Sequence, residues 1–186
     1  MSNLTKKAIK TSFLKLLNEY PLSKISVRSI VEDCGINRNS FYYHYSDIPA
    51  LIDEIIREEV DALISKYPSV NTLDECIHIA FAFSLENKKA VMHIYNSVNR
   101  DIYESSLMKI CEYAVTSYLD TAFGRNNVSE HSRTLAIRFI KCGLFGLVYE
   151  WVSTGMNDDA ITDIEYAANI LHGLSADIIE RIRENE

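Results

Sequence analysis

Apolar residues recur along this chain at intervals of three and four, the spacing that places them on one face of an α-helix. In the first predicted helix, residues 4–18, the inward positions are Ile9, Phe13, Leu16 and Leu17. Similar periodicity continues with few interruptions towards the C-terminus, and no strand-like alternation persists. The pattern therefore predicts an all-α protein.

Proline and capping residues indicate where these helices begin and end. Tyr20-Pro21 and Tyr67-Pro68 end two of them, because the residue before proline disfavours the helical conformation. Capping boxes, in which a Thr and a Glu bind each other's backbone amides, start at Thr72 and Thr162. Beyond residue 47 the predicted helices cover residues 48–66, 73–86, 88–97, 100–123, 130–154 and 163–184.

Residues 26–47 contain two short helical patterns joined by a turn. Ser26 can cap the first helix and Asn37 the second. Gly35, between them, can adopt the left-handed conformation that ends a helix. The second helix carries no acidic residue. This arrangement is typical of a helix-turn-helix whose second helix enters the DNA major groove.

The exposed positions of this motif offer the side chains that contact DNA. Phe41 and Tyr45, four residues apart, face inward and leave polar and aromatic groups outside. Arginine binds phosphate or guanine, asparagine matches adenine, and hydroxyl groups donate to phosphate oxygens. The candidate DNA-binding residues are Ser26, Arg28, Asn37, Arg38, Asn39, Ser40, Tyr42, Tyr43 and His44. The alternative is a helical corner of a larger bundle with tyrosines at its surface.

The segment SVRSIVEDCGINRNSFYYHYSDIPALIDEI resembles the DNA-binding region of the TetR, or tetracycline-repressor-like, family. The match spans about residues 8–65, and its fixed positions are occupied by Val27, Ile30, Cys34, Gly35, Ile36, Phe41, Tyr42, His44 and Tyr45. The chain departs from the pattern where the fourth helix starts, because Ile48 and Pro49 stand where the family often has a phosphate-binding lysine. The resemblance implies a three-helix head, joined by a long fourth helix to a helical ligand-binding and dimerisation body.

Charge separates the head from the body. The whole chain has a formal net charge of −7, which alone argues against nucleic-acid binding. Residues 1–50 hold seven Lys or Arg and four Asp or Glu, which gives +3 and leaves −10 for the other 136 residues. We therefore expect a DNA-binding domain over residues 1–47 and an effector-binding and dimerisation domain over residues 48–186. The outward lysines of the first helix either contact DNA or form a solvated surface: Lys6, Lys7, Lys10 and Lys15.

Composition excludes several other classes of protein. Hydrophobic residues make up 47% and charged residues 24% of the 186, which indicates a globular chain. No segment has 18 uninterrupted apolar residues and no signal peptide is present, so we expect a soluble, cytoplasmic protein with no membrane partner. The four cysteines are expected to be reduced core residues, with thiol sensing by Cys111 or Cys142 as the alternative. His78 and His93 lack a third partner at metal-ligand spacing, so neither a metal nor a cofactor is predicted.

Residues 135–152 are apolar nearly all round the predicted helix, so they must be covered on several sides. The last predicted helix adds a second apolar stripe, and the two together can form a four-helix interface with another copy. The resemblance places the dimer contact here as well. The predicted interface residues are Phe139, Gly143, Gly146, Leu147, Leu171, Leu174 and Ile178. The alternative is that both helices belong to the core of the monomer.

Between residues 72 and 124, aromatic residues and methionines with a few polar tips are typical of a small-molecule pocket. The candidate pocket residues are Phe81, Met92, His93, Tyr95, Tyr103, Met108 and Tyr113. The same residues suit an ordinary helical core, and no effector can be identified from them. A TetR-like protein is implied to bind an effector in this region.

The leading hypothesis is a homodimeric regulator, in the first place a repressor, that binds a palindromic double-stranded operator under the control of a small molecule. One alternative keeps the fold but assigns it an adaptor or coactivator role through protein contacts. A second is a helical enzyme or carrier, but the chain has no Ser/His/Asp or Cys/His motif and no glycine-rich phosphate loop. No catalytic residue is therefore predicted.

Overall fold

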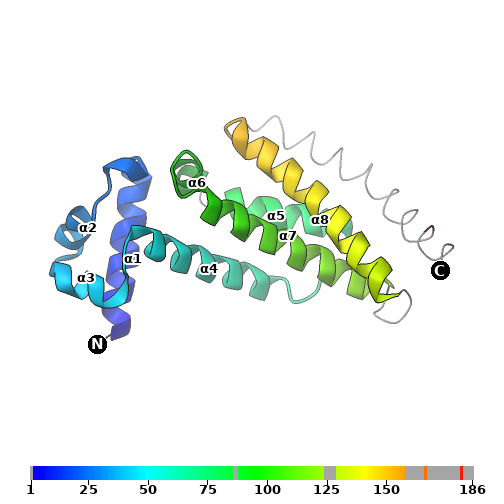
Figure 1. Cartoon of the computed structure of the whole chain (residues 1–186), viewed down its shortest axis with the longest axis horizontal. Coiled ribbons are helices and arrows are strands. Elements are labelled where there is room, and N and C mark those ends of the chain that lie inside the picture. Colours follow the sequence, from blue (N-terminus) through cyan, green and yellow to red (C-terminus); the bar gives the residue numbers. More distant parts are fainter. Residues whose placement is uncertain (1, 86–87, 124–128, 158–165, 167–180, 182–186) are drawn as a thin grey trace. The chain divides into compact units, whose positions relative to one another are not determined.

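The computed structural model describes residues 2–85, 88–123 and 129–157, together with Tyr166 and Arg181. This part of the chain is helical and contains no strand, which confirms the all-α prediction (Figure 1). The elements are α1 (Ser2–Glu19), a 3-10 turn η1 (Leu22–Lys24), α2 (Val27–Cys34), α3 (Arg38–His44), α4 (Ile48–Lys66), α5 (Leu73–Leu85), α6 (Lys88–Tyr95), α7 (Arg100–Phe123) and α8 (Glu130–Ser153). The predicted helix over residues 163–184 lies almost entirely outside the described residues.

The chain divides into two compact units. Unit 1 comprises Met1–Glu59 and Asn87–Glu104, and unit 2 comprises Val60–Glu86 and Ser105–Glu186. The division falls inside α4 and α7. The predicted domain boundary after residue 47 follows the helix-turn-helix instead, and stays a prediction.

The core of unit 1 is built around α1. This helix packs against α2, α3 and α6, and Figure 1 shows α2 and α3 beside it. Its apolar face, with Ile9, Phe13 and Leu17, is buried as the periodicity predicts. Ser12 lies on the same buried face, and its hydroxyl donates to the backbone oxygen of Ile30 at 3.1 Å, so no polar group is left unsatisfied there.

Helix α6 is tied to α1 through a histidine. His93 Nδ1 lies 2.7 Å from the backbone oxygen of Leu17. Because a carbonyl oxygen can only accept, Nδ1 must carry the proton in this contact. Leu17 belongs to the last turn of α1, where carbonyl oxygens have no partner within the helix. His93 therefore supplies a hydrogen-bond donor to a free carbonyl oxygen at the end of α1, and it joins α6 to α1.

Unit 2 is held by contacts among α5, α7 and α8. The ring centroids of Phe81 on α5 and Trp151 on α8 are 5.0 Å apart, and the thiol of Cys76 donates to the backbone oxygen of Ala114 on α7 at 3.4 Å. Arg133 Nη2 on α8 lies 2.5 Å from Asp120 Oδ1 on α7. The interior of the unit thus contains apolar and sulfur contacts, and an ion pair joins two of its helices.

The capping box predicted at Thr72 forms only in part. Its hydroxyl accepts from the amide of Glu75 at 3.1 Å, as predicted. The carboxylate of Glu75, however, accepts from the amide of Asn71 at 2.7 Å, one residue before the expected position. The reciprocal bond was therefore wrong by one residue, because the glutamate side chain reaches past the cap. The box predicted at Thr162 lies outside the described residues.

The cysteines differ in their environments. Cys76 and Cys111 are buried, and burial raises the pKa of both thiols to about 12. Cys34 is half-buried, whereas Cys142 is exposed on α8. The prediction of a core position was therefore wrong for Cys142, since the helical pattern of α8 did not show which face the rest of the chain covers.

The described residues contain neither a membrane-spanning helix nor a cluster of metal-binding side chains. None of the helices they form is both long and apolar enough to cross a membrane. The same residues contain no group of three or more His, Cys, Asp or Glu side chains placed to hold a metal ion.

Candidate nucleic-acid interface

The first helix of the motif, α2, is defined at both ends by local hydrogen bonds. Ser26 is its N-cap, and the Ser26 hydroxyl accepts from the amide of Ser29 at 3.1 Å while the Ser29 hydroxyl accepts from the amide of Ser26 at 3.0 Å. Gly35 follows the helix with φ +70°, the left-handed conformation. The predicted cap and turn are therefore confirmed.

The second helix, α3, begins at the predicted cap. Asn37 Oδ1 accepts from the amide of Ser40 at 2.8 Å and from its hydroxyl at 3.1 Å. Phe41 and Tyr45 are buried, and their ring centroids are 5.8 Å apart. Their burial orients the helix, so that its opposite face is exposed as predicted.

The exposed face of α3 is cationic and aromatic. The side chain of Tyr43 is 80% exposed and that of Tyr42 is 45% exposed, and Arg38 and Asn39 beside them are also exposed. Arg38 Nη2 donates to the Tyr42 hydroxyl at 3.1 Å, and its guanidinium lies 5.5 Å from the centre of the Tyr42 ring. His44 is half-buried, with its ring edge-on to that of Tyr43. The Arg38–Tyr42 pair presents two donors without any nearby carboxylate on the same helix.

Arg28, the candidate on α2, forms an ion pair with an acidic residue of the same helix. Its Nε lies 2.7 Å from Glu32 Oε1, one helical turn away, and both side chains are largely exposed. The hydrogen bond to Glu32 raises the pKa of Arg28. An exposed pair of this kind contributes little to stability, so a phosphate can replace the carboxylate at small cost.

Most of the basic face of α1 is already paired within unit 1. Lys6 and Lys10 bind carboxylates of α4, and Lys15 Nζ lies 2.5 Å from Asp33 Oδ1. The ion pairs show that these three lysines are not simply solvated, and the alternative of a DNA contact stays a prediction. Within residues 2–47, the cations that make no ion pair are Lys7, Lys24 and Arg38.

Lys24 is therefore a candidate that the sequence interpretation missed. It is exposed and lies two residues before Ser26, next to the N-terminus of α2. Backbone amides at a helix N-terminus favour anions, and an adjacent cation adds to that preference. The spacing of a lysine just before a helix cap was the signal that pointed to it.

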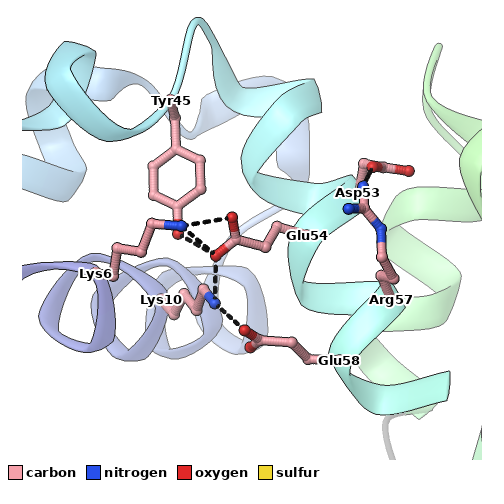
Figure 2. A network of polar contacts seen from close by, with 7 residues as sticks. All are labelled: Lys6, Lys10, Tyr45, Asp53, Glu54, Arg57 and Glu58. Carbon is pink, nitrogen blue, oxygen red and sulfur yellow. Dashed lines mark hydrogen bonds and ion pairs between the residues drawn. The ribbon is translucent and has the colours of Figure 1, made fainter. Parts of the chain in front are cut away.

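A polar network fixes the end of α3 against α1 and α4 (Figure 2). The Tyr45 hydroxyl donates to Glu54 Oε1 at 3.0 Å. Lys6 Nζ lies 2.9 Å from Glu54 Oε2, and Lys10 Nζ lies 2.6 Å from Glu54 Oε1 and 2.6 Å from Glu58 Oε1. Two lysines of α1 and two glutamates of α4 thus pair directly, so that their four formal charges sum to zero, and Tyr45 adds a hydrogen bond to Glu54.

The protonation state of Glu54 follows from these contacts. Burial alone raises the pKa of a carboxyl group, but hydrogen bonds from Lys10, Lys6 and Tyr45 outweigh it and lower the pKa of Glu54 to about 2. Burial and the bond to Glu54 raise the pKa of Tyr45. Glu54 is therefore ionised and Tyr45 neutral near neutral pH, which is the state that the network requires.

The predicted pocket residues are distributed over both units. Met92, His93, Tyr95 and Tyr103 belong to unit 1, and Phe81, Met108 and Tyr113 to unit 2. The rings of Tyr95 and Tyr103 meet edge-on at 6.3 Å, Phe81 contacts Trp151, and the Tyr113 hydroxyl donates to the backbone oxygen of Tyr67 at 2.6 Å. The assignment of these residues to an effector site stays a prediction.

The predicted dimer residues on α8 form an exposed stripe. Phe139 is 73% exposed, Gly143 and Gly146 are exposed, Leu147 is half-buried, and Leu135 extends the stripe by one turn. Among the described residues, a Cβ atom added at either glycine meets no neighbouring atom within 4 Å. Packing within this part of the chain therefore does not account for these glycines. Three predicted interface residues lie outside the described part: Leu171, Leu174 and Ile178.

Comparisons with known proteins agree with this geometry. A family model for the transcriptional regulator C-terminal region, TetR_C_8, matches residues 71–174, more than half of the chain. No curated protein matches the sequence.

Three solved structures share the fold. The dihydroxyacetone kinase operon activator DhaS has a TM-score of 0.63 at 16% identity, over 89% of this chain and 97% of that one. NalD of Pseudomonas aeruginosa, the secondary repressor of the MexAB-OprM multidrug efflux pump, has a TM-score of 0.59 at 16% identity, over 89% and 92%. A TetR transcriptional regulator from Rhodococcus sp. RHA1 has a TM-score of 0.58 at 13% identity, over 92% and 97%.

Proposed function

Because the chain belongs to the TetR family of transcriptional regulators, we propose that it binds a palindromic DNA operator as a homodimer. Residues 1–47 form the DNA-binding domain in this proposal, and residues 48–186 form the effector-binding and dimerisation domain. The observation that carries it is the exposed face of α3, where Arg38 and Tyr42 hold each other in place and no carboxylate competes.

Some polar groups of the motif are suited to contact DNA bases, and others are suited to bind the phosphate backbone of the DNA. Arg38 and Asn39 are the side chains suited to the edges of guanine and adenine, and Tyr43 can lie against a thymine methyl group. Lys24, at the N-terminus of α2, and Tyr42 are suited to phosphate oxygens. The remaining candidates support these contacts as further donors or caps: Ser26, Arg28, Asn37, Ser40 and His44.

Dimerisation is supported by the exposed stripe on α8. Phe139 is a large apolar side chain left in solvent, and the open space above Gly143 and Gly146 allows a second helix to approach closely. A pair of helix-turn-helix heads also matches two half-sites about one DNA turn apart, which one head cannot read. Phe139 and Leu147 are therefore proposed to pack against a second copy of the chain.

We propose repression as the mode of regulation and a small molecule as the effector. The solved structures with a similar fold include an activator, DhaS, and a repressor, NalD, so the fold is compatible with activation and with repression. Repression needs the fewest further contacts, because a bound dimer blocks access to the DNA that it covers. An effector that favours one arrangement of α4 would change the affinity for the operator.

Selection of DNA from a random pool by the full-length protein tests this function. We expect recovery of a palindromic sequence, bound with an affinity that falls steeply as salt increases. Arg38→Ala combined with Tyr42→Ala should weaken that binding about 100-fold or more, since each base or phosphate contact is worth about 1–3 kcal/mol. Lys89→Ala, which removes an exposed cation on α6, is the matched control and should bind as the wild type does.

The main competing function keeps the fold but replaces DNA with a protein partner. In that case no sequence is enriched from the pool, and the protein co-purifies in a stable complex with a second protein. Enrichment that survives the double substitution in α3 would also reject the proposed interface.

A further inference from the structure

A cavity of about 660 Å³ opens within unit 1, outside the exposed face of α3. Three segments contribute to its wall, at the end of α6 and just after it, before α2, and at the start of α4. The lining residues are Pro21, Leu22, Ser23, Ile25, Ile48, Pro49, His93, Asn96, Ser97, Val98 and Asn99. Sites for small molecules have volumes of about 300–1,000 Å³. The cavity is therefore large enough for a ligand, and it lies within one compact unit.

The position of the cavity relates it to the helix-turn-helix. The segment 21–25 leads into Ser26, which caps α2, and Ile48 follows the end of α3 by a few residues. The wall thus includes the chain on both sides of the DNA-binding motif. Ile48 and Pro49 are also the residues that replace the usual lysine of the family, and here they supply apolar surface to the cavity.

The polar part of the lining has free hydrogen-bonding capacity. His93 uses Nδ1 to bind Leu17, so Nε2 makes no hydrogen bond with the described residues. Asn96 uses its Nδ2 to donate to the backbone oxygen of Met92 at 2.9 Å, and its Oδ1 has no partner among them. The side chains of Ser23 and Asn99 make no hydrogen bond in the same part of the chain.

The charge of the lining restricts the ligand. None of the residues that form the wall is an Asp, Glu, Lys or Arg. A charged ligand would lose its hydration without gaining a counter-ion, whereas a neutral one can exchange water for the imidazole, amide and hydroxyl groups. Leu22, Ile25 and Ile48 offer apolar surface to the rest of the molecule.

We propose that this cavity is a binding site for a small neutral molecule that combines an apolar part with both a hydrogen-bond donor and an acceptor, as in a lactam or a similar amide. The donor binds His93 Nε2 or Asn96 Oδ1, and the acceptor binds the Ser23 hydroxyl or the Asn99 amide. Of the predicted pocket residues, His93 lines this cavity, whereas Phe81, Met92, Tyr95, Tyr103, Met108 and Tyr113 do not.

Occupancy of the cavity affects DNA binding in this proposal. A ligand that bridges residues 21–25 to residues 93–99 favours one position of Lys24 and of the N-terminus of α2. If this position differs from the one in the DNA complex, the ligand and DNA change each other's affinity by the same factor. This regulatory part rests on the proposed DNA binding, whereas binding of the ligand itself does not.

The first experiment measures binding without DNA. The probe is 2-pyrrolidone, a neutral lactam, followed by the backbone amide signals of the full-length protein in two-dimensional NMR. We expect saturable shifts at residues 22–25 and 96–99 with an affinity on the order of millimolar, which is the scale for so small a probe. Pyrrolidinium and cyclobutanecarboxylate, charged molecules of similar size, should cause no saturable shift there.

Two double variants test the location. Ser23→Ala with Asn99→Ala removes lining groups that make no hydrogen bond in the described structure, so folding is preserved. Binding should weaken about tenfold, because the acceptor of the probe loses both of its alternative donors. Thr11→Ala with Asn18→Ala removes a hydroxyl and an amide from exposed positions of α1 that do not line the cavity, and should leave the shifts unchanged.

Three results would overturn the site: no saturable shift with 2-pyrrolidone, equal shifts with a charged probe, or unchanged binding in the Ser23 and Asn99 variant. The regulatory part has a separate readout, the affinity for selected DNA with and without saturating 2-pyrrolidone. We expect a change of at least about threefold, within the range of allosteric coupling. Probe binding that leaves this affinity unaltered rejects the regulation alone, and failure to select any DNA rejects the proposed function but not the site.

Discussion

The hydroxyl of Tyr45 donates a hydrogen bond to Glu54 Oε1 at 3.0 Å, although the ring of Tyr45 is buried beside Phe41. Tyr45 is the C-cap of α3, and its amide donates to the backbone oxygen of Phe41 at 2.9 Å. The same side chain therefore packs under the proposed DNA-reading helix and binds the carboxylate that holds two lysines of α1. Tyr45 therefore links the end of α3 to α4, in addition to the direct packing of α3 against α1 and α2.

Glu54→Gln should destabilise the folded protein by about 1–3 kcal/mol, because Lys6 and Lys10 lose a shared carboxylate in a partly buried position. Denaturant unfolding followed by circular dichroism measures the change. Asp53→Asn is the matched control on the same helix: it breaks the exposed Asp53–Arg57 pair and should cost less than about 0.5 kcal/mol. Equal losses in the two variants would show that the network does not stabilise unit 1.

Tyr45→Phe should keep the ring packing and lose only the hydroxyl contact, at a cost of about 0.5–1.5 kcal/mol. Because phenylalanine keeps the buried ring of Tyr45, we expect the variant to fold. The loss of stability by itself should not change the DNA affinity of the folded protein. A lower DNA affinity of the variant would therefore indicate that the hydrogen bond orients α3. The affinity for the selected operator, measured at a temperature where both proteins are folded, tests this.

Stability should decline in acid through Glu54. The pKa of Glu54 is about 2 in the folded protein and lies near 4.5 in an unperturbed carboxyl group. A lowered folded-state pKa means that the contribution is complete above pH 4.5 and is lost as the pH falls from there towards 2. The stability difference between wild type and Glu54→Gln should therefore shrink over this interval. A difference that stays constant from pH 6 to pH 3 would contradict the assignment.

Salt dependence should distinguish free lysines from paired ones. Lys24→Ala should reduce the slope of log K against log salt by about 1, because it removes one phosphate contact. Lys6→Met should leave the slope unchanged, since Lys6 is bound to Glu54. A slope that falls as much for Lys6→Met as for Lys24→Ala would place the first helix on the DNA after all.

Two glycines should respond in opposite ways to alanine. Gly35→Ala should destabilise the protein by about 1 kcal/mol or more, because its φ of +70° is unfavourable for a residue with a side chain. Gly146→Ala, inside α8 and with open space around it, should be neutral or slightly stabilising for the single chain. Thermal unfolding of both variants at a low protein concentration gives the comparison.

A larger side chain at Gly146 tests the dimer. Gly146→Leu should weaken self-association by about tenfold or more, because it fills the space through which a second helix approaches. Thr134→Leu adds the same side chain at an exposed position that lies on a different face of α8, and should leave association unchanged. Sedimentation equilibrium measures both. A monomeric wild type, or a Gly146→Leu variant that associates normally, would reject the proposed interface.

Local features of the fold were predictable from the sequence. The caps at Ser26 and Asn37 and the left-handed turn at Gly35 involve residues only a few positions apart, so their residue types are sufficient to determine them. The burial of Phe41 and Tyr45 also follows from helical spacing. These same features carry the resemblance to the TetR family, and the match over residues 71–174 confirms the family.

Contacts between distant residues were not predictable in the same way. Lys6 and Glu54 are 48 positions apart, and His93 and Leu17 are 76 apart. Periodicity shows that Lys6 points away from the core of its own helix, but many partners are possible for an outward lysine. Only the packing of α4 beside α1 decided that this lysine binds a carboxylate of α4.

The sequence by itself thus determined the helices, the helix-turn-helix and the family, because each depends on short-range spacing and on residue type. The tertiary structure alone decided which cations remain unpaired, which face of α8 stays exposed, and where residues 21–25, 48–49 and 93–99 meet to form a cavity. Those properties depend on which helices pack together, and the short-range spacing of residues does not determine that packing.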